Sequence, residues 1–95
     1  GETALMTASR TGRANAVAVL LQRGANVAAT ERRGQTALMW AAAEGHADVV
    51  ELLIRAGADP RTSLPDSGFT AFHFAAREGR ADVVNALLRA GVDVN

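Results

Sequence analysis

The sequence predicts an all-α solenoid, in which stacked helix-turn-helix units are joined by hairpin-like loops. Glycines recur along the chain with a period of about 33 residues, and recurrence at such a period is typical of repeat architectures. Each period contains two short stretches whose apolar residues have helical spacing. The segments between periods are short, polar and rich in turn-forming residues, which favours loops.

The glycines also set the boundaries of the repeated units. We expect one domain, residues 1–95, that consists of repeats 1–33, 34–67 and 68–95, with one additional residue in the second linker. The glycines that open each unit, separate its two helices and close its second helix are, in that order, Gly1, Gly34 and Gly68, then Gly12, Gly45 and Gly79, then Gly24, Gly57 and Gly91.

Both ends of the predicted stack are apolar. Terminal repeats of solenoids normally carry a polar outer face, and neither end of this chain has one. We therefore expect interior copies of a longer array, with marginal stability or end-to-end self-association when the chain is isolated. The residues concerned are Ala16, Val17, Val19, Leu20 and Leu21 in the first unit and Val83, Val84, Leu87 and Leu88 in the third.

The middle unit shows the helix signals most clearly. Its first helix is predicted over residues 37–44, because Thr36 is a suitable N-cap and strong helix formers follow it. Gly45 comes next, and a residue without a Cβ readily adopts the left-handed conformation that ends a helix. The second helix is predicted over residues 46–56, with Gly57 as its terminator.

Charge and hydrophobicity agree with this second helix. Asp48 lies in its first turn and Arg55 in its last turn, where these charges complement the helix dipole. Its apolar face is too wide for one neighbour to cover, so stacked copies must cover it from more than one side. That face consists of Val49, Val50, Leu52, Leu53 and Ile54.

The linkers, residues 27–33 and 60–67, are expected to form the hairpin-like loops, because both are polar and too short for another helix. The second linker contains Pro60 and Pro65, which would interrupt regular strand pairing. It ends in an Asp-Ser-Gly run that suits a turn. We expect its tip to differ from the tip of the first.

A short motif begins each unit, and a closing motif follows the second helix. The motifs are Thr3-Ala4-Leu5-Met6, Thr36-Ala37-Leu38-Met39 and Thr70-Ala71-Phe72-His73, the Ala-Ala-x-x-Gly-His run at residues 41–46, and Gly57-Ala58-Asp59. With the period of about 33 residues, they resemble the ankyrin repeat family over the whole chain. The resemblance implies a turn and two helices per unit, and binding of another protein through a concave surface.

The chain departs from the family pattern in three ways. Alanine replaces the usual proline at the first helical position of every unit, which keeps good helix propensity. Met6 and Met39 replace the motif histidine, so we expect its hydrogen bond to the threonine only between His73 and Thr70. Pro60 replaces a usual valine.

Composition argues against several classes of function. Ten acidic and ten basic residues cancel, so neither nucleic acid nor an anionic membrane is an expected partner. The absence of cysteine excludes disulfides and thiolate chemistry and leaves the compartment undetermined. No apolar run is long enough to span a bilayer, and no signal peptide is evident in this stretch. We expect a soluble chain.

No residue pattern indicates catalysis, a metal or a cofactor. The serines Ser9, Ser63 and Ser67 lie in no nucleophile motif. His46 has no second ligand at helical spacing, and the family motif gives both it and His73 a structural place. The pair Asp48 and Glu51 is expected on a solvated helix face, and the glycines are not clustered as a phosphate loop. We expect no catalytic, metal or cofactor site.

Two aromatic residues need separate interpretations. Trp40 aligns with Thr7 and Phe74 at a position that family members usually fill with buried leucine, so core packing is expected. Phe69 aligns with Glu2 and Gln35, at a family position that usually faces solvent on the concave side. Its ring either contacts a partner or packs against the hairpin.

The partner-binding candidates are positions that differ between the three copies, because such positions are free of the packing constraint. The resemblance places them at the hairpin tips and the ends of the first helices. They are Glu2, Arg10, Thr11, Arg32, Arg33, Gln35, Ala43, Glu44, Asp66, Ser67, Phe69, Arg77 and Glu78. Two alternatives stay open: a targeting module of a larger enzyme, and a structural array that self-associates end to end.

Overall fold

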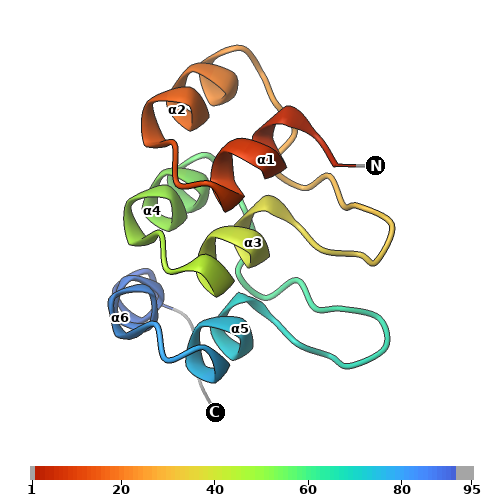
Figure 1. The fold of residues 1–95 in the computed structure, drawn as a ribbon, viewed down its shortest axis with the longest axis vertical. Coiled ribbons are helices and arrows are strands. Elements are labelled where there is room, and N and C mark those ends of the chain that lie inside the picture. The colour runs from red at the N-terminus through yellow and green to blue at the C-terminus, as the bar shows by residue number, and fades with distance from the viewer. Residues whose placement is uncertain (1, 92–95) are drawn as a thin grey trace.

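Two parallel columns of helices build the molecule. A computed structural model describes residues 2–91, and within them the chain forms six helices and no strand. The first helix of each unit stacks in one column and the second helix in the other, while the two linkers project from the side of the first column (Figure 1). The helices are α1 (Ala4–Arg10), α2 (Ala14–Gln22), α3 (Ala37–Glu44), α4 (Ala47–Arg55), α5 (Ala71–Arg77) and α6 (Ala81–Arg89). The predicted all-α solenoid is confirmed.

Threonine precedes the first helix of every unit. The hydroxyl of Thr36 accepts a hydrogen bond from the amide of Met39 at 3.2 Å, as its N-cap role predicts. Thr3 does the same with the amide of Met6 at 3.1 Å. The first helix of every unit therefore begins directly after an equivalent threonine, and in the first two units the hydroxyl of that threonine caps the helix.

The expected bond between threonine and the motif histidine is present in the third unit. The amide of Thr70 donates to Nδ1 of His73 at 3.1 Å, and the threonine hydroxyl lies 2.9 Å from the same nitrogen. In the other two units the replacing methionines Met6 and Met39 are buried. The sulfur of Met6 also lies 3.5 Å from the amide of Thr3, so this side chain partly substitutes for the histidine.

Helix ends follow the glycine pattern. Gly45 caps α3 in the left-handed conformation with φ of 82°, which confirms the predicted terminator. The helix α4 begins one residue later and ends one residue earlier than residues 46–56, because His46 and Ala56 are its N-cap and C-cap. Such cap residues are only half within a helix.

The core lies between the two columns and between successive units. Val49, Val50 and Leu53 of α4 are completely buried, because α4 packs against α3, α2 and α6. Leu52 and Ile54 are partly buried against the same core. The prediction that this wide apolar face needs cover from more than one side is therefore correct.

The two linkers close in the same way but have different tips. In the first, the amide of Glu31 donates to the carbonyl of Gln35 at 3.0 Å. In the second, the amide of Leu64 donates to the carbonyl of Phe69 at 2.8 Å. Gln35 and Phe69 are equivalent, so the additional residue of the second linker lies in its tip, which differs from the first as expected.

The second and third units are each joined to the preceding unit by a hydrogen bond from a side chain to a backbone carbonyl. Nε2 of His46 lies 3.0 Å from the carbonyl oxygen of Arg10. Because a carbonyl only accepts, Nε2 carries the hydrogen. One unit later, Nε of Arg80 donates to the carbonyl oxygen of Ala43 at 3.0 Å. In both cases the residue after the helix-separating glycine reaches back to the end of the preceding first helix.

These two side chains lie directly over glycines. A Cβ added at Gly12 would be 2.6 Å from Cε1 of His46, and one added at Gly45 would be 3.0 Å from Cδ of Arg80. Both glycines also have positive φ, so they combine a backbone requirement with a close approach. The structural role expected for His46 is therefore a contact between units.

The effect of that contact can be separated from backbone strain. Gly12 and Gly24 both have positive φ, and a Cβ at Gly24 would meet no described atom within 4 Å. Each change to alanine should cost about 1–2 kcal/mol for the left-handed conformation. We expect Gly12→Ala to cost a further ~1 kcal/mol or more, because its Cβ overlaps the His46 ring. Urea unfolding of both variants measures the difference.

Replacing the ring provides the control. In a double-mutant cycle, His46→Ala should remove most of the additional cost of Gly12→Ala, since the overlapping atoms are gone. Equal losses of stability in Gly12→Ala and Gly24→Ala would contradict the proposed contact.

Candidate functional site

The second linker, the tip of the first linker and α5 enclose a groove of about 640 Å³. Its walls contain six of the thirteen residues predicted to bind a partner, although these six are spread over 45 residues of sequence, from Arg33 to Arg77. The residues that line it are Arg33, Gln35, Leu64, Asp66, Ser67, Phe69, Phe74 and Arg77. The groove thus brings together most of the candidates that follow Thr11 in the sequence.

Local hydrogen bonds hold both rims of the groove. In the first linker, Oε1 of Glu31 accepts from the amides of Arg33 at 2.7 Å and Gln35 at 3.0 Å. In the second, the hydroxyl of Ser67 accepts from the amide of Phe69 at 3.1 Å. Each rim is therefore a defined turn, and the side chains that follow it have fixed starting positions.

An aromatic cluster forms the floor near α5. The ring of Phe69 stacks on His73 with centroids 5.2 Å apart and meets Phe74 edge to face at 5.8 Å. Phe69 is half-buried as a result. Its two sequence interpretations are thus compatible, because the ring packs against its own unit and still lines the groove.

Two guanidinium groups and one carboxylate set the charge of the groove. The guanidinium of Arg77 lies 5.8 Å from the Phe69 centroid and 5.1 Å from that of Phe74, distances that allow cation–π attraction. It also pairs with Glu78 at 3.1 Å. Arg33 is exposed, and its side chain makes no hydrogen bond or ion pair within residues 2–91. Asp66 supplies the carboxylate.

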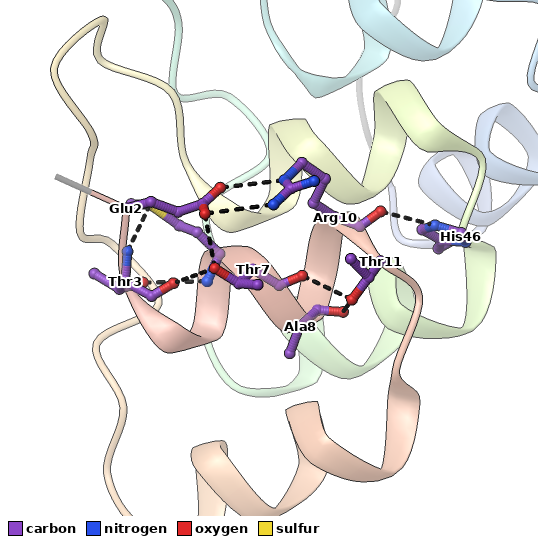
Figure 2. A network of polar contacts seen from close by, with 8 residues as sticks. Glu2, Thr3, Thr7, Ala8, Arg10, Thr11 and His46 are labelled. Carbon is purple, nitrogen blue, oxygen red and sulfur yellow. Dashed lines mark hydrogen bonds and ion pairs between the residues drawn. The ribbon is translucent and has the colours of Figure 1, made fainter.

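The candidates Glu2, Arg10 and Thr11 lie outside this groove and make hydrogen bonds on and beside α1 (Figure 2). The carboxylate of Glu2 pairs with Nε of Arg10 at 3.2 Å and accepts from the hydroxyl of Thr7 at 2.8 Å. The hydroxyl of Thr11 donates to the carbonyl of Thr7 at 2.8 Å. Hydrogen bonds from Arg10 and then Thr7 hold the pKa of Glu2 below its ordinary value.

The remaining candidates are separate from the groove walls. Arg32 is exposed at the first loop tip, and Glu44 is exposed at the end of α3. Ala43 is partly buried, and its carbonyl is used by Arg80. Glu78 is the partner of Arg77 in the ion pair described above.

Two groove residues were not among the sequence candidates. Leu64 is the only large apolar side chain in the polar linker 60–67, and that isolation could have identified it. Phe74 was assigned to the core by its alignment with Trp40. It is indeed buried, yet one part of it lines the groove.

Trp40 packs against the core as expected and is only partly buried. The guanidinium of Arg10 lies 5.9 Å from its ring centroid. Within residues 2–91 no group of three or more metal-ligating side chains gathers. No helix in this part of the chain is long and apolar enough to cross a membrane.

Comparison with known proteins gives one positive finding. A family model described as ankyrin repeats in three copies matches residues 1–63 and again residues 28–95. No curated protein matches the chain.

The pairing of Glu2 makes stability depend on pH in a defined direction. A lowered folded pKa gives stabilisation that is present above the unfolded pKa, about 4.3, and is lost as the pH falls through the folded value. We expect Glu2→Gln to be less stable than the wild type at pH 7 and equally stable at strongly acidic pH. Urea unfolding across this range measures both.

Glu44→Gln is the matched control, because the exposed Glu44 makes no ion pair within the described residues. Its stability difference from the wild type should be small and should vary less with pH. A Glu2→Gln difference that persists below the folded pKa would show that the charge of Glu2 is not the cause.

Proposed function

The chain belongs to the ankyrin repeat family, and on that premise we propose that it is a non-catalytic module that binds a partner protein in the groove, on the concave face of the stack. Ankyrin repeats are generally protein–protein interaction modules and are typically non-catalytic. The main support for choosing this surface is that six positions that vary between the copies line a single groove.

Rigidity supports binding at this place. The floor is packed through Phe69, His73 and Phe74, and both rims are hydrogen-bonded turns. A surface that is already ordered loses little conformational entropy when a partner binds, so more of the contact energy remains as affinity. The groove is therefore suited to bind a partner in the conformation that it already has, without a large rearrangement.

The chemistry of the walls indicates what the partner presents. Leu64 and Phe69 offer apolar contact, and Phe74 adds to it. Arg33 has a guanidinium without a partner among the described residues, which can form paired hydrogen bonds with a carboxylate. We infer a partner segment that places an apolar side chain on the aromatic cluster and an acidic side chain beside Arg33.

The two alternative roles differ in the surface that they use. A targeting module of a larger enzyme would hold its substrate or scaffold protein in this groove, and catalytic residues would lie elsewhere in that enzyme. A self-associating array would instead use the two end faces of the stack, whose apolar residues Val19 and Leu88 are exposed.

Removing the two groove cations tests the proposal. We expect the Arg33→Ala and Arg77→Ala double variant to capture a specific partner from extracts of the source organism at least about tenfold less efficiently than the wild type, which corresponds to about 1.4 kcal/mol. Quantitative mass spectrometry of the captured proteins measures this. Phe69→Ala should give a similar loss, with helicity checked by circular dichroism because the ring also packs internally.

Arg55→Ala is the control, because it removes one positive charge from the last turn of α4, in the other helix column. It should capture the partner as the wild type does. If capture is lost in Arg55→Ala and retained in the groove variants, the binding surface lies on the second helices and the proposed site is wrong.

A further inference from the structure

The groove contains two charged side chains that the internal contacts leave unused. Three charged residues line it, and one of them, Arg77, is paired with Glu78. Arg33 and Asp66 are exposed, and neither side chain makes a hydrogen bond or an ion pair within residues 2–91. They do not pair with each other either. Among the described residues, the groove therefore offers one unpaired cation and one unpaired anion to a ligand.

A contact between the two linkers fixes where these charges start. A Cβ added at Gly34 would be 2.9 Å from Cδ of Pro65, so the linkers touch at this point on the side of the first column from which both project (Figure 1). Arg33 directly precedes Gly34, and Asp66 directly follows Pro65. Proline fixes its own φ, and each linker is closed by a backbone hydrogen bond. The two charges thus flank a defined contact, one on each linker.

Apolar side chains accompany the two charges. Leu64 lies near the same contact, because its Cδ2 would be 3.9 Å from a Cβ at Gly34. Phe69 and Phe74 complete the apolar part of the lining. The groove volume of about 640 Å³ falls within the range of roughly 300–1,000 Å³ that is usual for ligand-binding pockets. The groove can therefore hold an apolar side chain together with charged neighbours.

On the premise of the proposed function, we propose that the groove binds a partner segment in which one acidic and one basic side chain flank an apolar one. The acidic side chain pairs with Arg33, and the basic side chain pairs with Asp66. The apolar side chain packs on Leu64 and Phe69. The basic side chain is the new element, and it makes the preferred segment zwitterionic.

The carboxylate of Asp66 also acts against other ligands. A purely acidic segment would pair with Arg33 but would bring a like charge close to Asp66, and such juxtaposition costs binding energy. A nucleic-acid strand carries a phosphate at every nucleotide and would meet the same repulsion. Protein interfaces often gain specificity from a repulsive element of this kind. Asp66 therefore selects among the ligands that Arg33 alone would attract.

Selection from a phage-displayed library of random peptides tests the proposal, with the immobilised chain as bait. The wild type should select peptides in which an acidic and a basic residue flank an apolar one. Arg33→Glu should select peptides with two basic residues, and Asp66→Arg should select peptides with two acidic residues. Each reversal changes the preferred charge at one position only, so these expectations hold for either direction of the bound peptide.

Two charge reversals outside the groove are the matched controls. Arg32→Glu makes the same change as Arg33→Glu at the neighbouring position of the loop tip, and Arg32 does not line the groove. Glu44→Arg reverses a carboxylate, as Asp66→Arg does, at the exposed end of α3. Both controls should select the same peptides as the wild type. Circular dichroism checks that all four variants keep their helices.

Titration of one selected peptide measures the Asp66 contact directly. In fluorescence polarisation, Asp66→Ala should weaken binding about two- to fivefold, which is the range of exposed ion pairs. Replacing the basic residue of the peptide by alanine should weaken binding to the wild type equally. It should have no further effect on binding to Asp66→Ala. Losses that simply add would show that the two groups do not interact and would overturn the proposal.

The possible outcomes separate this inference from the proposed function. If the wild type and Asp66→Arg select the same acidic and apolar peptides, the inference is wrong and binding in the groove still stands. If the groove variants and the controls all select the same peptides, the peptides bind elsewhere and the proposed function fails as well. A wild type that selects no peptide would overturn the inference, while capture of the partner from extracts still decides the proposed function.

Discussion

A unit of two short helices is too small to bury its own apolar face, and the remaining structure depends on this constraint. Val49, Val50 and Leu53 of α4 are completely buried between this helix and its neighbours. Their counterparts Val17, Val83 and Leu87 are completely buried as well, and the helices α2 and α6 that carry them pack against α4. Stability in such a chain resides in interfaces between units as much as in the units themselves.

Close stacking requires a turn without side-chain bulk between the two helices of a unit. It also requires a contact that fixes the position of each unit relative to the preceding one. Gly12 and Gly45 meet the first need, since the next unit lies where a Cβ would be. His46 and Arg80 meet the second by binding a carbonyl of the preceding helix. A histidine and an arginine perform the same task, because only a donor with sufficient reach is needed.

The groove that we propose as the binding site lies mostly outside the stacked helices. Its lining residues come from the two linkers and from α5, and none of them belongs to α4. Asp66 and Ser67 of the longer second linker line it together with Arg33 of the first linker. Under the proposed function, recognition and the packing of α4 therefore use different residues, and the groove can change its chemistry while the contacts of α4 stay the same.

The sequence by itself determined the helices, their caps and their order. Thr36 and Gly45 act on backbone groups within a few residues, so their roles were readable locally. Only the tertiary structure decided that His46 binds a carbonyl 36 residues away, that Glu2 is paired with Arg10, and that Phe69 packs and lines a groove at once. Those contacts depend on how the loops and units are placed in space, and the repeat period alone does not specify that placement.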